Sequence, residues 1–167
     1  MTNFTNITLG FTAISTALIA GLFYAYSCSV NPGLGKLPDK EYIAAMQSIN
    51  LAIINPVFIL SFMGTLILLP LCTYLHYARP FPARFVLLGI ASLIYITGTF
   101  GITILGNVPL NDTLASYDIK AASINEIADQ RIKFEVPWNR LHTIRTVAAV
   151  TALSLVIIAC LYDHKNS

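Results

Sequence analysis

Long stretches without charge are the feature that most constrains this chain. No charged residue precedes Lys36, none lies between Tyr42 and Ala78, and none lies between Phe85 and Asn111. A helix that crosses a bilayer needs roughly 20 mostly apolar residues, and each stretch is long enough. Charged residues make up 11% of the 167 residues, against about 25% in a soluble domain. The sequence therefore predicts an integral membrane protein and excludes a nucleic-acid binder or an ordinary water-soluble enzyme.

We predict one all-α domain over residues 1–167, an up-down bundle of four membrane-spanning helices. The expected spans are Ile7–Val30, then Pro56–Tyr77 after an entry segment at Tyr42–Asn55, then Phe85–Gly106, and a fourth helix that ends at Tyr162. Asn31-Pro32-Gly33 has turn chemistry and is expected to end the first span. Pro56 is expected to kink the second.

The fourth apolar stretch looks too short to span the membrane alone. Thr146–Tyr162 gives only about 25 Å of helix at 1.5 Å per residue. The helix must start earlier, and Pro137 suits a first-turn position. Trp138, His142 and Arg145 then lie on one face, at positions i, i+4 and i+7. Ionisable groups are costly in a membrane, so these residues need a partner or a purpose.

The connection from Asn107 to Val136 intersperses apolar residues among charges. This pattern favours an amphipathic helical segment at the bundle mouth or in the membrane interface. It would act as a lid over a pocket, or simply pack as a loop.

Polar side chains gather at the four helix ends that an up-down topology brings together. They predict a polar-rimmed pocket opening toward the long third connection. The residues expected to line it are Tyr24, Asn31, Gln47, Asn50, Asn107, Asn111, Trp138, His142 and Arg145. The alternative is a ring of interface residues that meets the lipid headgroups, with the side chains pointing outward. A neutral imidazole at His142 would be able to act as a base.

No metal constellation is visible in the sequence. It has no inward pair of carboxylates, no His-x-x-x-His and no pair of thiolates, so we expect neither a metal nor another cofactor. The expected partners are the membrane and a hydrophobic small molecule or lipid, with no nucleic acid, and assembly into a homo-oligomer stays open. The expected location is the cell (inner) membrane. Arg79, Arg84 and Lys165, in short segments on the side of the termini, favour an orientation with both termini inside.

Four motifs, in order, resemble the anthrone-oxygenase-like family of small four-span membrane proteins. They cover most of the chain between Gly21 and Thr146. The motifs are FYAYSCSVNPGL at 23–34, MQSIN at 46–50 with NPVF at 55–58, NVPLN at 107–111, and WNRLHTIRT at 138–146. At His142 the chain departs from the family pattern, in which Asn is common.

The resemblance implies an O₂-dependent oxidation of a hydrophobic polycyclic or aromatic substrate, of the anthrone-to-anthraquinone type, without a cofactor. In that reaction His142 would be the base, and Arg145, Asn107 and Asn111 would hold the oxyanion. Phe23, Tyr24 and Trp138 would line the pocket for the rings. The alternatives are a lipid- or hydrophobe-binding membrane protein without catalysis, and a structural membrane subunit.

Overall fold

A computed structural model describes residues 2–162, and this part of the chain is helical, with no strand. The α-helices are α1 (Thr2–Ala25), α2 (Asn31–Leu34), α3 (Asp39–Ala52), α4 (Pro56–Leu75), α5 (Ala83–Ile94), α6 (Val108–Ala115) and α7 (Ile124–Leu161). Three π-helical segments connect some of them without a break: Tyr26–Val30, Tyr95–Gly101 and Thr103–Asn107.

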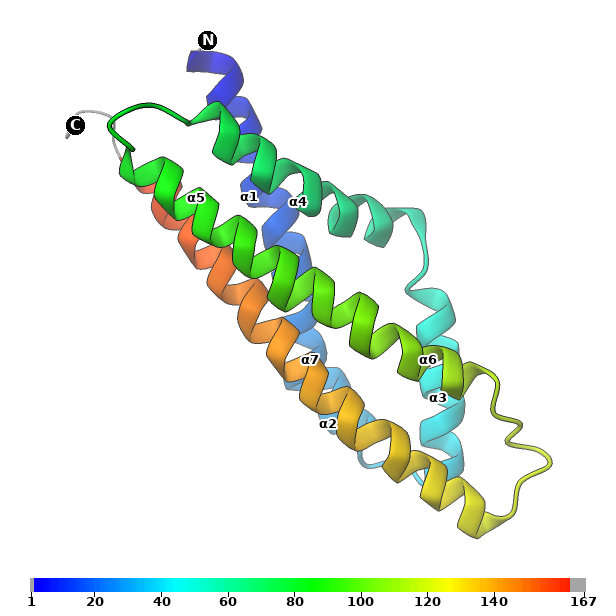
Figure 1. Ribbon diagram of the computed structural model, residues 1–167. Coiled ribbons are helices and arrows are strands. Elements are labelled where there is room, and N and C mark those ends of the chain that lie inside the picture. The colour runs from blue at the N-terminus through cyan, green and yellow to red at the C-terminus, as the bar shows by residue number, and fades with distance from the viewer. Residues whose placement is uncertain (1, 163–167) are drawn as a thin grey trace.

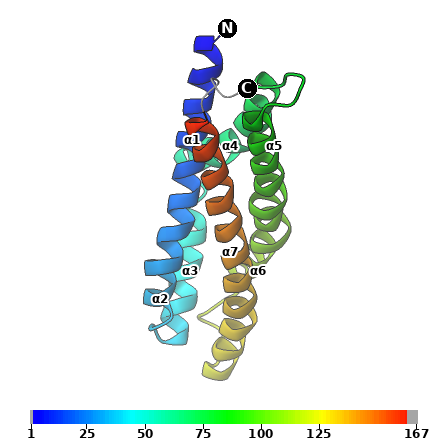
Figure 2. The same cartoon turned by 90° about the vertical axis from the view of Figure 1, so that its left-hand side faces the viewer.

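These elements form four long apolar helices, which confirms the predicted all-α bundle. The four helices are Phe4–Leu34, Pro56–Leu75, Ala83–Ala115 and Ile124–Leu161, and each is long and apolar enough to span a membrane. They alternate in direction, and the fourth lies between the first and the third and packs against both (Figures 1 and 2). By length and composition the chain is an integral membrane protein.

The first helix is longer than expected, because Asn31-Pro32-Gly33 does not end it. The chain continues through Pro32 to Leu34. A proline inside an α-helix lacks its N–H and clashes with the carbonyl four residues earlier. The π-helical turn at Tyr26–Val30 spaces the preceding carbonyls differently, so Pro32 is accommodated. Pro109 likewise follows the π-helical turn at Thr103–Asn107.

The fourth helix also begins earlier than expected. Pro137 lies inside α7, which starts at Ile124. Ser123 caps this start with a capping box: its hydroxyl accepts from the Glu126 N–H, and its own N–H donates to the Glu126 carboxylate. The prediction that Arg145 is helical holds, but the first-turn role of Pro137 is wrong.

The connection between the third and fourth helices is largely helical, as predicted, but it forms no separate surface helix. Its helical parts are α6, which continues the third helix, and the first turns of α7. A short non-α segment between Ala115 and Ile124 joins them.

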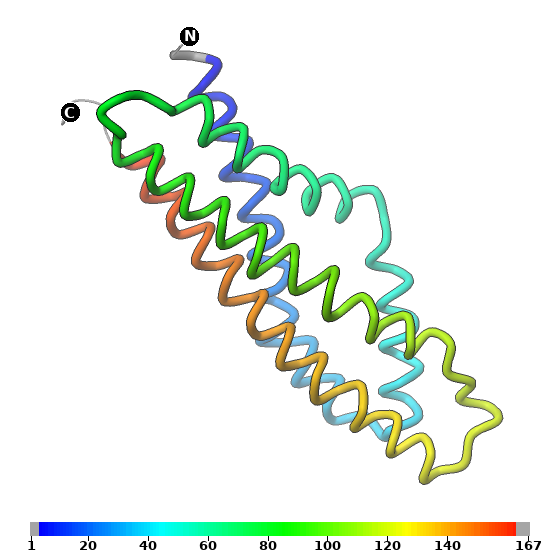
Figure 3. The backbone as a smooth tube through the Cα atoms, viewed as in Figure 1, coloured from blue at the N-terminus to red at the C-terminus, as the bar shows by residue number. Residues whose placement is uncertain are grey.

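The second helix is interrupted rather than kinked. α3 ends at Ala52, and Asn55 adopts an extended backbone and caps α4 by accepting from the Phe58 N–H at 3.1 Å. The chain therefore turns sharply between α3 and α4 (Figure 3). α4 has 20 residues, about 30 Å of helix, and so matches the hydrocarbon core by itself.

The other three long helices extend past the start of α4, which marks one boundary of the hydrocarbon core. α7 has 38 residues, about 57 Å, and its last 20 residues begin at His142. Beyond that level, α2, α3, α6 and the first part of α7 form an extension that carries most of the charged residues of the described chain. His142 and Arg145 thus lie near the boundary of the hydrocarbon.

Two hydrophobic cores lie on either side of this boundary. The membrane core packs small residues of α7, such as Ala149 and Ala152, against Phe23, Phe62 and Tyr95. The helices approach closely there, as small residues allow in membranes. The core of the extension has its largest side chains at its centre, which are Tyr42, Met46, Leu114, Phe134 and Trp138.

Arg131 ties the extension together. Its guanidinium donates to the carboxylates of Asp39 and Glu135 at 2.9 and 2.7 Å and to the Gly35 and Leu37 carbonyls. It also lies 4.4 Å from the Tyr42 ring centroid. Burial raises the pKa of the Tyr42 hydroxyl, so this ring remains neutral beneath the cation.

We expect Arg131→Met to lower the free energy of unfolding by about 2 kcal/mol, because several charge-assisted hydrogen bonds are lost together. The measurement is the thermal midpoint in detergent. Lys133→Met, at an exposed neighbouring position, is the control and should leave the midpoint unchanged. Equal midpoints for both variants would contradict the role of Arg131.

Candidate functional site

A layer of buried polar side chains separates the two cores. Trp138, His142 and Arg145 share one face of α7, and 3%, 1% and 8% of each residue is exposed. All three point into the bundle rather than toward lipid. This direction distinguishes a pocket from a ring of interface residues.

Arg145 is a buried cation with no acidic partner in the described part of the chain. Its Nε and Nη2 contact His142 Nδ1 at 3.1 Å, and its Nη1 donates to Thr103 Oγ1 at 3.3 Å. The guanidinium carbon lies 4.4 Å from the centroid of the Phe23 ring and 5.2 Å from that of Trp138. Aromatic faces and a neutral imidazole stabilise a cation only partly. Since buried charges are normally paired, the site is complementary to an anion.

The contacts of His142 define its tautomer. An arginine only donates hydrogen bonds, so Nδ1 is an acceptor and carries no proton. In a neutral imidazole the proton is then on Nε2, which lies 2.9 Å from Ser27 Oγ and donates to it. Ser27 in turn donates to the Phe23 carbonyl at 3.0 Å. His142 thus links Arg145 to the first helix.

Trp138 forms the third part of this layer. Its ring stacks on the His142 ring, with centroids 5.0 Å apart and planes inclined by 11°. Its Nε1 donates to Asn111 Oδ1 at 2.8 Å, and Asn107 Nδ2 donates to its carbonyl at 3.3 Å. Asn107 and Asn111 are therefore attached to α7 from the third helix.

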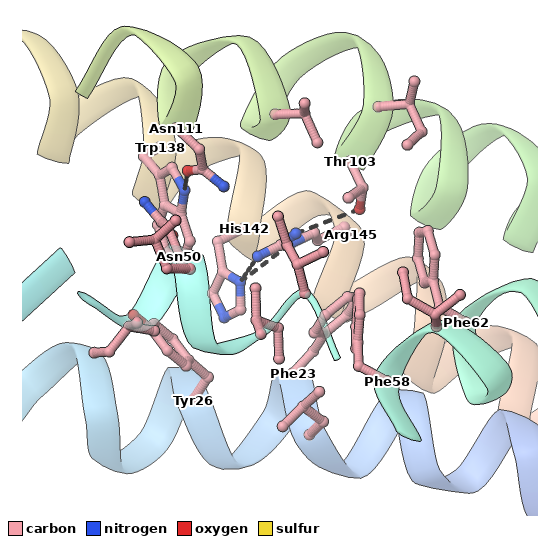
Figure 4. Close-up of a pocket in the computed structure, with 18 of the residues that line it drawn as sticks. Phe23, Tyr26, Asn50, Phe58, Phe62, Thr103, Asn111, Trp138, His142 and Arg145 are labelled. Atoms are coloured by element: carbon pink, nitrogen blue, oxygen red, sulfur yellow. Dashed lines mark hydrogen bonds between the residues drawn. The ribbon is translucent and has the colours of Figure 1, made fainter. Parts of the chain in front are cut away.

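A cavity of about 340 Å³ lies against this layer, within the usual size range of ligand pockets. One wall carries Trp138, His142 and Arg145 (Figure 4). The remainder of the lining is mostly apolar and comes from α1, the α3–α4 region, α4 and the third long helix. A mostly apolar lining with a cation on one wall suits an apolar molecule with a polar or anionic edge.

Most of the residues expected in the pocket lie at this cavity. They are Phe23, Gln47, Asn50, Asn111, Trp138, His142 and Arg145. The Asn50 side chain is almost buried, and its Nδ2 has no hydrogen-bond partner among the described residues. A ligand oxygen at this edge of the cavity would satisfy that donor.

Three expected residues lie elsewhere. Tyr24 is 59% exposed on the outer face of α1 and does not line the cavity. Asn31 lies beyond the cavity, and Asn107 is buried behind it, against Trp138. The assignment of Tyr24 failed because Phe23, and not Tyr24, lies one turn before Ser27 on the inward face of the helix.

Sequence reasoning missed Tyr26, Phe58, Phe62 and Met63, all of which line the cavity. The Tyr26 ring centroid lies 5.2 Å from that of His142 and 5.4 Å from that of Trp138. Tyr26 lies three residues after Phe23, and this helical spacing could have placed it on the same inward face. Phe58 ends the NPVF motif, but Phe62 and Met63 gave no signal, because a large apolar residue in an apolar span is equally typical of the core.

The π-helical segments coincide with this site. Ser27 and Thr103, which contact His142 and Arg145, both lie in such segments. π-Helical turns are rare and occur often at functional sites. In residues 2–162 no group of three His, Cys, Asp or Glu side chains is placed to hold a metal ion.

Fold and site together define a small helical membrane protein with an apolar cavity and a buried cation. The family model for anthrone oxygenase matches residues 57–155, more than half of the chain. The chain therefore belongs to the anthrone oxygenase family. The matched region contains Trp138, His142 and Arg145, whereas Phe23 and Asn50 precede it. No curated protein and no solved structure matches the chain.

A buried charge without a counter-ion costs stability, so Arg145→Met should leave the thermal midpoint unchanged or raise it. Removing the buried ion relieves a desolvation penalty of several kcal/mol. Leaving His142 Nδ1 without its hydrogen-bond donor costs about 1–3 kcal/mol. Phe134→Ala, at an ordinary core position, is the comparison and should lower the midpoint. A large fall for Arg145→Met would show that Arg145 is structural.

Proposed function

We propose that this protein is a membrane-embedded oxygenase-like enzyme acting on a hydrophobic polycyclic aromatic substrate. The observation that carries the proposal is Arg145, a buried guanidinium at the wall of an apolar cavity, with no carboxylate partner among residues 2–162. Membership of the anthrone oxygenase family supports an oxidation of the anthrone-to-anthraquinone type.

In that reaction the methylene carbon between the two outer rings becomes a carbonyl. Its two hydrogens leave with one oxygen atom of O₂ as water, and the other oxygen atom forms the new C=O bond. Loss of one methylene proton gives an anion whose charge is delocalised onto the existing oxygen atom, and this anion is the species that O₂ oxidises.

Arg145 is the group that stabilises this anion. A fixed cation in a water-poor site stabilises developing negative charge more strongly than water does. The rings would lie among Phe23, Tyr26, Phe58 and Phe62, and Asn50 Nδ2 would donate to a second substrate oxygen.

His142 is the candidate base. In the described arrangement its Nδ1 accepts from Arg145 and its Nε2 carries the proton, so neither nitrogen has a free lone pair. Nδ1 becomes available when the Arg145 donors turn to the substrate oxygen. Substrate binding would thus expose the base, and the proton transfer that follows would give the anion that neutralises the neighbouring cation.

We further propose a cell (inner) membrane location with both termini inside. Arg79 and Arg84, in or next to the short connection between α4 and α5, support this orientation because positive residues in short loops face inward. Lys165, the third residue of that argument, lies outside the described residues.

The test is O₂-dependent conversion of anthrone to anthraquinone by protein in lipid vesicles. Arg145→Gln should lower the rate by about 10²–10³-fold, as expected when an anion-stabilising donor is lost. Arg140→Gln, at an exposed position on the same helix, is the matched control and should retain the wild-type rate. Equal rates for the two variants would contradict the proposal. Bound anthraquinone without any turnover would identify a binding protein instead.

The His142 role has its own prediction. His142→Asn places an amide oxygen close to the position of Nδ1, so it keeps an acceptor for Arg145 but removes the base. We expect turnover to be lost while the thermal midpoint is retained. If the Asn variant stays active and His142→Ala does not, His142 is a positioning residue for Arg145 rather than the base.

A further inference from the structure

We propose that the cavity opens sideways into the bilayer, so that the substrate enters from lipid rather than from water. The proposal rests on the proposed function, because it concerns the route to the same site. The opening, called here the lateral mouth, is formed by Leu51, Ile54, Ile59, Met63 and Ile104.

These five residues line the cavity and are also exposed. The exposed fractions are 71% for Leu51 and 72% for Ile54, and they are between 38% and 43% for the other three. All five are apolar. Ile59 and Met63 lie within α4, and Ile104 follows Thr103 at the level of Arg145, whereas Leu51 and Ile54 lie just before α4, at the edge of the hydrocarbon. Apolar side chains that are exposed at this depth contact lipid rather than water. The cavity is therefore continuous with the lipid-facing surface of the bundle.

The interruption between α3 and α4 creates this opening. Asn55 starts α4 in a new direction, so α4 packs against α1 and α5, while α3 packs against α6 and α7. The first turns of α4 diverge from the third helix near Thr103–Ala115 (Figure 1). Ile54 and Met63 on one side and Ile104 on the other border the resulting space.

The aqueous end of the cavity is crossed by hydrogen bonds and carries a charged residue. Gln47 Nε2 donates to the Leu114 and Tyr117 carbonyls at 2.8 and 2.9 Å, which joins α3 to the end of α6. The buried side chains of Met46 and Leu114 fill the space behind this link. Asp112 is the exposed charged residue of the lining, on α6 in the extension.

The lateral mouth selects the form in which the substrate arrives. A rim of isoleucine, leucine and methionine admits a flat, uncharged, lipid-dissolved molecule and disfavours an anion. Arg145 lies on the opposite wall, on α7, so the molecule meets the cation only once inside. Ionisation would therefore follow entry, and the charged form would be retained at the site until it reacts.

The single tryptophan, Trp138, provides the test, because it lines the cavity and a quinone bound there should quench its fluorescence. Protein in phospholipid vesicles is mixed rapidly with anthraquinone, which partitions into the bilayer. Ile104→Phe should slow the onset of quenching at least severalfold. Leu105→Phe is the matched control: Leu105 is the next residue, is 82% exposed and does not line the cavity. It should leave the rate unchanged.

A second pair keeps the test decisive if Ile104→Phe fails to fold. Ile54→Phe should slow quenching, whereas Val57→Phe, at a position that is 75% exposed and outside the cavity, should not.

Two results would overturn the proposal. One is equal rates for mouth and control variants. The other is quenching by a water-soluble anthraquinone sulfonate, added outside, as fast as by anthraquinone. Slower quenching in mouth variants of a protein that turns over no anthrone would leave the route standing and refute the proposed function.

Discussion

The hydrogen bonds from the Arg145 guanidinium to His142 Nδ1 are the interaction on which the rest of the site depends. They hold a cation at the hydrocarbon boundary without neutralising its charge. Ser27 and Trp138 fix the imidazole, and Thr103 contacts the guanidinium from the third helix. A carboxylate in place of His142 would pair with the guanidinium and compete with any anionic ligand. A neutral acceptor orients the cation and leaves its charge available.

The position of this pair follows from the unequal lengths of the helices. α4 alone matches the membrane, and the other three continue into an extension with its own hydrophobic core and the Arg131 cluster. The polar layer lies where the two cores meet, so its groups are excluded from water but lie near the interface. The interruption before α4 places the cavity beside this layer. The same length mismatch thus accounts for the depth of the cation, the cavity and the apolar opening.

The sequence predicted the helical periodicity well and the local backbone less well. Trp138, His142 and Arg145 at i, i+4 and i+7 lie on one inward face, as their spacing required. The helix ends at Pro32 and Pro137 were wrong, because a π-helical turn accommodates the first and the Ser123 capping box starts α7 well before the second. Tyr24 was expected to face the pocket, but it lies on the outer face of α1, next to the inward-facing Phe23. Phe62 and Met63 of α4 lacked a sequence signal, since large apolar side chains are as typical of a membrane core as of a ligand site.

The measurement that tests the central claim most directly is mass spectrometry of the small molecules that co-purify with the protein in mild detergent. The uncompensated charge of Arg145 predicts that a hydrophobic, acidic aromatic compound accompanies the wild-type protein and is lost from Arg145→Met. That substitution leaves the apolar lining of the cavity unchanged, so both proteins should retain neutral lipids equally. Recovery of the same molecules from both, with no acidic aromatic compound enriched in the wild type, would contradict the claim that Arg145 is held ready for an anionic ligand.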